Sequence, residues 1–336
     1  MMTWDRVRGH ETIVKSFDSA WRRGRLGHAY LFSGPTGVGK HTFARELARS
    51  LLCETPAGQL QACGKCAACA LVDAGTHPDL FLAARPEDKV EFPIELIREL
   101  IEHLALKPAR GGRKVAIVDD ADDLNAEAAN AFLKTLEEPP PGSVLILIGG
   151  PSPERQFSTI LSRCQTVGFA PLPNELVAEF LRHQGIADET KLDRLVRVAG
   201  GSPGQALALD DESLWEFRKS LLKALESDPV DAFDLATRWN QHVEDAGKEA
   251  GVRRRRTSLV LRLLIGMLQD ALRIVHGVSP LVADPTESAV LERVGRRLGA
   301  EKLMAWIDRA ADADVQVDRK VQLELVVEAF ADALAR

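Results

Sequence analysis

The sequence of 336 residues is long enough for two or three domains, since a domain usually holds about 100–200 residues. A composition of 45% hydrophobic and 27% charged residues excludes a disordered chain, a collagen-like chain and a coiled-coil rod. The formal net charge of −6 excludes a surface that binds nucleic acid non-specifically over its whole extent. Residues 1–16 lack the apolar core of a signal peptide, and no apolar run approaches the ~20 residues that span a bilayer. We therefore expect a cytoplasmic protein without membrane contacts.

The first predicted elements are a strand and a helix on either side of a glycine-rich turn. Residues 28–33 form a short apolar and aromatic run, and apolar residues recur at helical spacing over 42–52. A glycine-rich turn between a strand and a helix N-terminus is the context of a phosphate loop, in which backbone amides and a lysine contact phosphates. The residues that carry this pattern are Gly34, Gly37, Gly39 and Lys40. The alternative is a turn of the same composition that binds nothing.

The position after Lys40 departs from the phosphate-loop pattern. The pattern has Ser or Thr there, whose hydroxyl ligates Mg²⁺, and this chain has His41. Thr42 carries a hydroxyl one residue later, but on a helix it lies about 100° further around the axis. The sequence thus predicts the shape of a nucleotide site, with Thr42 as the nearest substitute for the missing hydroxyl, and leaves its activity open.

Two further apolar runs, at 114–118 and 144–148, are typical of parallel strands buried on both faces. Between them, residues 126–138 are predicted as a helix that ends at three prolines. This alternation indicates a doubly wound α/β domain over residues 1–170.

Asp119 follows the apolar run 114–118, where a phosphate-loop ATPase places the aspartate on the metal side of its site. Such an ATPase usually has a glutamate next, and Asp120 is one methylene shorter. The competing interpretation is a solvated acidic turn, because Asp122 and Asp123 follow closely. We predict Asp119 as a nucleotide-site residue and Asp120 as a poor replacement for the glutamate.

The remainder of the chain is predicted to be helical. Residues 171–210 contain short helical segments that we interpret as a lid, and residues 211–336 contain no strand candidate and form an all-α C-terminal domain. The strongest basic run, residues 253–256, consists of four arginines, which we interpret as solvated rather than as a binding patch.

Four of the five cysteines lie within the seventeen residues 53–69, and such clustering in a cytosolic chain indicates a metal site rather than disulfides. The four predicted ligands are Cys53, Cys63, Cys66 and Cys69. Four thiolates suit tetrahedral Zn²⁺ in a closed, structural site, whereas an iron–sulfur cluster is the chemical alternative.

Several motifs in one order carry a resemblance to a known family. They are His28-Ala29-Tyr30-Leu31-Phe32, the phosphate loop, the four cysteines, the segment 130–140 (NAFLKTLEEPP) and Ser162-Arg163-Cys164. This series closely resembles the bacterial clamp-loader subunits of the AAA+ superfamily, over about residues 1–210. The resemblance implies an AAA+, RecA-like α/β fold with an inserted zinc module (53–69), a small helical lid and an all-α collar domain.

The resemblance also implies what this chain lacks. Clamp-loader ATPases carry a polar first sensor where this chain has Gly149-Gly150, and a second-sensor arginine where it has Gly204. Together with His41 and Asp120, these departures imply a subunit that does not turn over ATP itself. The intact loop leaves weak binding of ATP or ADP open.

In the family, the arginine that corresponds to Arg163 reaches into the ATP site of a neighbouring subunit, because a planar and permanently charged fork suits phosphate charge. The alternative is that Arg163 makes only local contacts. The resemblance implies a subunit of the DNA polymerase III clamp loader, part of that holoenzyme, which assembles with gamma/tau-type and delta-type subunits and reaches the sliding clamp and primed DNA through the complex. Two other functions stay open: an active gamma/tau-like ATPase that uses Thr42 and Asp120, and a zinc-bearing nucleic-acid-binding module.

Overall fold

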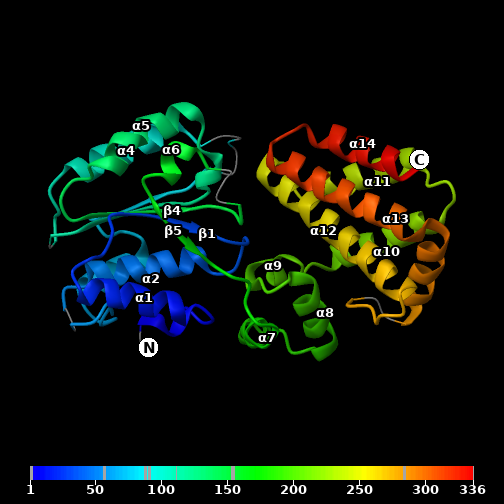
Figure 1. Ribbon diagram of the computed structural model, residues 1–336, viewed down its shortest axis with the longest axis horizontal. Helices are drawn as coiled ribbons and strands as arrows, with labels where there is room; N and C mark the ends of the chain where they lie inside the picture. Colours follow the sequence, from blue (N-terminus) through cyan, green and yellow to red (C-terminus); the bar gives the residue numbers. More distant parts are fainter. Residues whose placement is uncertain are drawn as a thin grey trace. The chain divides into compact units, whose positions relative to one another are not determined.

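The computed structural model describes residues 3–335 except 56–57, 87–88, 90–91, 111, 153–155 and 283–284. The chain divides into two compact units (Figure 1): Met1–Val177 with Gly201–Gly204, and Ala178–Gly200 with Gln205–Arg336. The division into three domains at residues 170 and 210 stays a prediction. Among the described helices, none combines the length and the apolar character that a membrane crossing requires.

The first unit is built on a parallel sheet of five strands in the order β2-β3-β4-β1-β5. The strands are β1 (Ala29–Ser33), β2 (Leu80–Ala83), β3 (Lys114–Val118), β4 (Ser143–Ile148) and β5 (Gln165–Gly168). The three central strands β3, β4 and β1 correspond to the three apolar runs, and every residue in them is buried. The expected doubly wound α/β fold is therefore confirmed, with β2 and β5 as additional edge strands.

Helices cover both faces of this sheet (Figure 1), with α1 and α2 on one face and α4 and α5 on the other. In chain order the helical elements of this unit are η1 (Thr3–Arg6), α1 (Glu11–Arg22), α2 (Lys40–Leu52), α3 (Ala67–Ala74), α4 (Ile94–Ala105), η2 (Ala121–Asp123), α5 (Ala126–Glu137) and α6 (Ser158–Leu161). Alternate strand residues point to opposite faces, so Phe32 contacts Phe43 of α2 at 5.6 Å between ring centroids, whereas Leu31 belongs to the core under α4 and α5.

The second unit is helical throughout its described part, as the sequence predicts for the C-terminal region. Its helices are α8 (Glu189–Ala199), α10 (Glu212–Glu226), α11 (Ala232–Glu244), α12 (Ala250–Val275), α13 (Pro285–Asp318, kinked at Gly299) and α14 (Leu323–Ala335), while α7 (Asn174–His183) and α9 (Pro203–Ala208) each cross from one unit to the other. Trp239 of α11 is fully buried and lies 5.8 Å from Phe330 of α14, which anchors these two helices together.

The parallel sheet also fixes where a ligand site can lie. The carboxyl ends of β1, β3 and β4 meet at one edge, next to the point where the strand order reverses. Doubly wound sheets bind ligands at this edge. The segments that follow these three strands are the phosphate loop, Asp119 and Gly149-Gly150, so the fold brings the predicted nucleotide-site segments together.

Candidate functional site

The phosphate loop has an ordered lysine. Lys40, the first residue of α2, donates hydrogen bonds from Nζ to the carbonyl oxygens of Gly34 at 2.6 Å and Pro35 at 2.7 Å. These bonds hold the ammonium group against the loop, ahead of the first turn of α2, whose amides have no intrahelical acceptor. The loop therefore combines a fixed cation with a helix N-terminus, which is the arrangement that binds phosphate groups.

Three carboxylates act on the charge of Lys40. The lysine side chain is only 6% exposed, and this burial lowers its pKa below the usual value. Asp119, Asp122 and Asp120 oppose the shift through their negative charges, in that order of strength. The predicted Asp119 thus lies within electrostatic reach of Lys40, and so does Asp122.

Asp122 reaches the end of β4, where the resemblance implies a polar first sensor. Its carboxylate accepts hydrogen bonds from the amide of Gly150 at 2.5 Å and from Nε2 of Gln156. A Cβ atom at Gly149 would lie 2.8 Å from Asp122 Oδ1, and one at Gly150 would lie 2.9 Å from Oδ2. The carboxylate therefore fills the space that a side chain at either glycine would need.

The segment that opens α9 rests directly on the phosphate loop. Gly204 donates its amide proton to the carbonyl of Gly37 at 3.0 Å, and Ser202 Oγ donates to the carbonyl of Thr36 at 2.7 Å. A Cβ atom at Gly204 would lie 2.8 Å from Gly37 Cα. Any side chain at position 204 would therefore require one of these two backbone segments to move, and an arginine would need far more space than an alanine.

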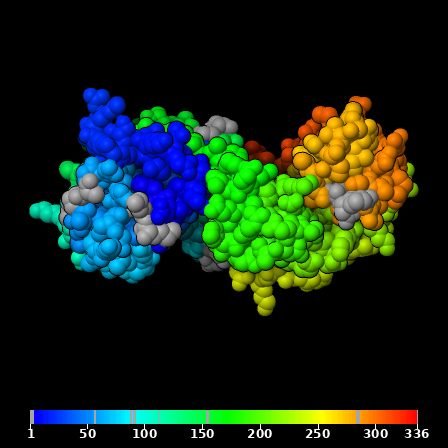
Figure 2. Space-filling view, turned by 90° about the horizontal axis from the view of Figure 1, so that it is seen from below, coloured from blue at the N-terminus to red at the C-terminus, as the bar shows by residue number. Residues whose placement is uncertain are grey.

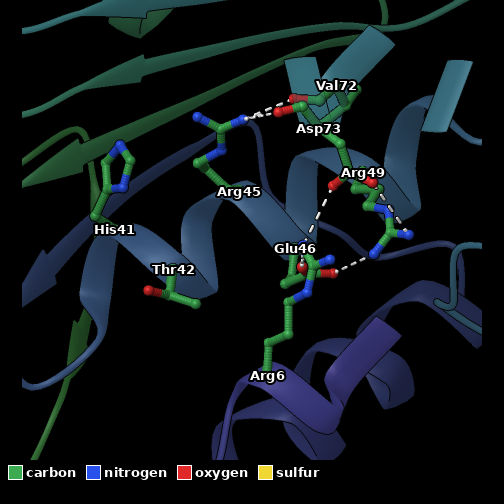
Figure 3. A pocket seen from close by; sticks show the side chains of 8 residues that line it. All are labelled: Arg6, His41, Thr42, Arg45, Glu46, Arg49, Val72 and Asp73. Carbon is green, nitrogen blue, oxygen red and sulfur yellow. Dashed lines mark hydrogen bonds and ion pairs between the residues drawn. The ribbon is translucent and has the colours of Figure 1, made fainter. Parts of the chain in front are cut away.

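A separate pocket of about 430 Å³ lies on the outer side of α2 (Figure 3). It is lined by Arg6, His41, Thr42, Arg45, Glu46, Arg49, Val72 and Asp73. Its cations already have partners, because Arg6 and Arg49 both bond Glu46, at 3.3 and 3.2 Å. The structure thus places Thr42, predicted for the nucleotide site, in a pocket whose described lining includes neither Lys40 nor Asp119.

Arg163 follows α6 and lies at the surface of the first unit with a side chain 28% exposed. Its guanidinium donates from Nε to Glu137 Oε1 at 2.7 Å, forms an ion pair with the same carboxylate, and donates to the carbonyl of Thr159 at 2.7 Å. Glu137 belongs to the segment 130–140 that carries the family resemblance. The segment 130–140 and the motif Ser162-Arg163-Cys164 therefore contact each other in the fold.

The four predicted cysteine ligands are brought together. Their Sγ atoms all lie within 4.8 Å of one another, and Cys53 and Cys66 are 3.9 Å apart. A tetrahedron with metal–sulfur bonds of about 2.3 Å has edges of about 3.8 Å, so these thiols fit a zinc ion. Backbone amides of Cys63, Cys66 and Cys69 donate to sulfur atoms of the cluster, which orients the thiols as ligands.

Two opposite effects act on these thiols. Amides of Lys65 and Cys66 that donate to Cys63 lower its pKa to about 6, whereas burial raises the pKa of Cys69 to about 12. A bound cation would compensate the charge of the buried sulfur, because a coordinating thiol is deprotonated.

The four-cysteine cluster is tied to the start of the chain. Trp4 donates from Nε1 to the carbonyl of Leu60 at 2.8 Å, and Leu60 donates its amide proton to Asp18 at 2.9 Å. Figure 2 shows the N-terminal residues, in dark blue, lying beside the light blue residues that follow α2. The loop that contributes the cysteines is thereby held against η1 and α1.

The arginine run 253–256 does not behave as a solvated patch, and this interpretation of the sequence is corrected. Arg254 donates to the carbonyls of Val317, Lys320 and Val321 at the end of α13. Arg256 forms an ion pair with Asp211 at 2.7 Å. Unpaired helix-end carbonyls and a carboxylate attract guanidinium groups, so these residues bind within the second unit.

Comparison with known proteins places the chain in a family. The model of the family described as DNA polymerase III, delta subunit, matches residues 9–173. The chain is 38% identical to DNA polymerase III subunit delta' of Pseudomonas aeruginosa over 65% of its own length and 67% of that protein, and 33% identical to the Escherichia coli subunit delta' over 88% and 83%. It is also 38% identical to Escherichia coli subunit tau, over 63% of this chain and 33% of that protein. Since the likeness to the Escherichia coli subunit extends over most of both proteins, the chain belongs to the family of DNA polymerase III delta' subunits.

Proposed function

We propose that this chain is a subunit of the DNA polymerase III clamp loader that does not hydrolyse ATP itself and that presents Arg163 to the ATP site of a neighbouring gamma/tau-type subunit. It would assemble in the cytoplasm with gamma/tau-type and delta-type subunits and act on the sliding clamp and primed DNA through the complex. The names of its relatives, delta' and tau, support this assembly.

The contact between Gly204 and Gly37 is the observation that carries the non-hydrolysing part of the proposal. The 2.8 Å separation between a Cβ atom at position 204 and Gly37 Cα leaves no room for a sensor arginine. His41 supplies no hydroxyl for Mg²⁺, and Asp120 has a left-handed backbone (φ 53°) that directs its short side chain differently from an extended residue. Positioning a water and stabilising the transition-state charge both depend on such groups.

The surroundings of Arg163 support a role in trans. Its described partners are Glu137, Thr159 and Ser162, all on α5, α6 or the turn after α6, and none belongs to the phosphate loop of this chain. An exposed ion pair of this kind contributes only about 0–1 kcal/mol, so the guanidinium can exchange Glu137 for a phosphate at low cost.

The test is the steady-state ATPase rate of the reconstituted loader, stimulated by clamp and primed DNA, with wild-type chain and with Arg163→Ala. Arginine fingers contribute about 10³–10⁵ in rate at the ATP site that they serve, so we expect Arg163→Ala to abolish measurable ATP hydrolysis at that site. Arg98→Ala is the matched control, because Arg98 is also a surface arginine in an ion pair, 3.6 Å from Glu127. An unchanged rate at equal assembly would refute the role of Arg163.

The intact phosphate loop favours a second candidate function, an active ATPase of the gamma/tau type. Lys40 is held in place by Gly34 and Pro35, and Asp119 acts on its charge. Magnesium-dependent turnover by the isolated chain, abolished by Lys40→Ala, would establish this function and overturn the first.

We further propose that the four-cysteine cluster holds a structural Zn²⁺. The donor set and the sulfur separations support a closed tetrahedral site, which has no open position for catalysis. The ion would fold the loop between α2 and α3 onto η1 and α1. Elemental analysis of the purified chain tests the assignment: one zinc per chain supports it, and iron in its place would favour a cluster.

A further inference from the structure

The pocket on the outer side of α2 contains one more cation than its carboxylates neutralise. Glu46 and Asp73 each form ion pairs with both Arg6 and Arg49, at distances from 3.2 to 3.4 Å. These two carboxylates and two guanidinium groups form a closed, neutral network at one side of the pocket (Figure 3). Arg49 is only 6% exposed, and its Nε atom is buried there without a hydrogen-bond partner. The charge of the third arginine in the lining, Arg45, is therefore in excess.

Arg45 uses only part of its guanidinium group within the chain. Its Nη2 atom donates to the carbonyl oxygens of Val72 at 2.7 Å and Asp73 at 3.1 Å, near the end of α3. Its Nε and Nη1 atoms have no acceptor among the residues that the structure describes, and no carboxylate there pairs with it. Figure 3 shows the other terminal nitrogen pointing away from the two carbonyls. Because the bonds through Nη2 hold the guanidinium in place, its remaining N–H groups are positioned in advance for an acceptor from outside the chain.

Two further polar side chains lie on the same side of α2. His41 is four residues before Arg45 and Thr42 is three residues before it, which makes both of them its neighbours on the helix, with about 5–6 Å between Cβ atoms. Both side chains are exposed, and neither the imidazole nor the hydroxyl group has a hydrogen-bond partner in the described part of the chain. A guanidinium, an imidazole and a hydroxyl group with unused hydrogen-bonding capacity therefore line this part of the pocket.

These groups favour a phosphate over other ligands. Val72 is the one apolar residue in the described lining, so the pocket offers little surface to an apolar ring. A carboxylate presents two oxygens in a plane, whereas a phosphate presents oxygens in several directions, which suits three separate donors. Arginine and hydroxyl side chains are common ligands of phosphate oxygens. The volume of about 430 Å³ lies within the range of about 300–1,000 Å³ of small-molecule sites and leaves room for the organic part of a phosphate ester.

We propose that this pocket is an anion site separate from the phosphate loop, in which Arg45, His41 and Thr42 bind a phosphate group. The group is either a free phosphate or a phosphodiester of a DNA strand, since both present the same oxygens. Neither Lys40 nor Asp119 belongs to the described lining, so the site does not need a nucleotide in the phosphate loop. The inference is independent of the proposed clamp-loader function, because no step of ATP hydrolysis passes through this pocket.

The experiment is an NMR titration of the full chain, labelled with ¹⁵N at arginine and histidine, with inorganic phosphate at constant pH and ionic strength. The signals of the Arg45 Nε–H group and of the His41 ring should shift together and saturate with one dissociation constant. The same titration with an octathymidylate that lacks terminal phosphates distinguishes the two sources. A response to the oligonucleotide identifies a DNA strand, and a response to inorganic phosphate alone identifies a free phosphate. Acetate is the comparison anion and should bind more weakly than phosphate.

Thr42→Val is the decisive variant, because it keeps the shape of the side chain and breaks no contact within the described chain. It should raise the dissociation constant for phosphate about two- to tenfold, which is the contribution of one neutral hydrogen bond. Arg45→Gln should raise it at least about tenfold, because hydrogen bonds to charged groups are stronger, but this variant also loses the contacts with the end of α3.

Arg273→Gln is the matched control for Arg45→Gln. Arg273 also donates to a backbone carbonyl, that of Ser279 at 2.8 Å, and forms no ion pair with any described residue, but it does not line the pocket. This control should leave the dissociation constant for phosphate unchanged.

Three outcomes would overturn the inference. The first is the absence of a saturable shift at Arg45 and His41 with either source of phosphate. The second is binding of acetate as tight as that of phosphate, which would assign the pocket to an acidic side chain of a protein partner instead. The third is an unchanged dissociation constant in both Thr42→Val and Arg45→Gln. None of them affects the proposed clamp-loader function, which the ATPase rate of the reconstituted loader with Arg163→Ala measures separately.

Discussion

Replacing Gly204 by alanine tests how tightly the segment Gly201–Gly204 packs against the phosphate loop. The new Cβ atom would lie 2.8 Å from Gly37 Cα and 3.2 Å from the Gly37 carbonyl oxygen, so one backbone segment must move by about 0.6 Å to restore an ordinary contact of 3.4 Å. The movement stretches two hydrogen bonds, from Gly204 to Gly37 and from Ser202 to Thr36.

The cost follows from these contacts. Overpacking of this kind destabilises by about 1–3 kcal/mol, and the better helix propensity of alanine returns up to about 1 kcal/mol. A net loss of about 1–2 kcal/mol corresponds to a drop of about 2–8 °C in the Tm of a unit of this size. Differential scanning calorimetry of the whole chain measures that shift.

Gly168→Ala is the control for Gly204→Ala, since Gly168 lies in the same unit and nothing stands within 4 Å of its Cβ position. The control should change the Tm by less than about 2 °C. If the segment Gly201–Gly204 lifts instead of straining the loop, the Gly204 amide, which donates to the Gly37 carbonyl, will exchange hydrogen faster. An unchanged Tm together with unchanged exchange would show that the contact is looser than 2.8 Å and would refute this reasoning.

Three further predictions follow from other contacts. Burial lowers the pKa of His77, whose Nδ1 accepts a hydrogen bond from the Asp79 amide. The unfolded chain therefore takes up the proton at a higher pH than the folded chain, and the stability should fall as the pH drops below about 6.5. His77→Asn, which keeps an acceptor, should make the Tm less sensitive to pH between about 7.5 and 5.5. Glu137→Gln should alter the loader ATPase rate by less than about fivefold, because the pair with Arg163 is exposed, and a loss as large as that of Arg163→Ala would mean that the carboxylate is indispensable. Cys69→Ser should abolish zinc retention in elemental analysis while substitution of the cysteine outside the cluster should not, and equal zinc in both variants would exclude the four-sulfur site.

The sequence predicts the central strands of the sheet and misses its edges, for a physical reason. The residues of β1, β3 and β4 are buried on both faces, so these strands appear in the sequence as nearly continuous apolar runs. β5 (Gln165–Gly168) has four residues, most of them exposed, and its strand conformation depends on pairing with β1. β2 (Leu80–Ala83) is equally short and pairs only with β3. Edge strands of this kind depend on tertiary contacts that a local pattern does not contain.

The candidate site likewise contains residues that local sequence patterns predict and residues that only the tertiary structure reveals. Lys40 and Asp119 belong to local patterns, a glycine-rich turn and a strand end, and the structure brings both to one edge of the sheet. Asp122 was seen only as part of an acidic turn, because its contact with Gly150 crosses 28 residues of sequence. The glycine pair at 149–150 was the available signal, since a strand end without side chains leaves space for a group from elsewhere.

The intramolecular contacts of the arginine run 253–256 limit how much of its charge is available to bind DNA. A four-residue basic patch that met four phosphates of duplex DNA would lower the logarithm of the binding constant with a slope of about 3.6 against the logarithm of salt concentration. Arg253 donates to the Gly247 carbonyl, Arg254 to three carbonyls at the end of α13, and Arg256 pairs with a carboxylate, which leaves Arg255 as the exposed member of the run. Whatever DNA binding residues 253–256 contribute should therefore show a salt slope of about 0.9, the signature of a single displaced counterion.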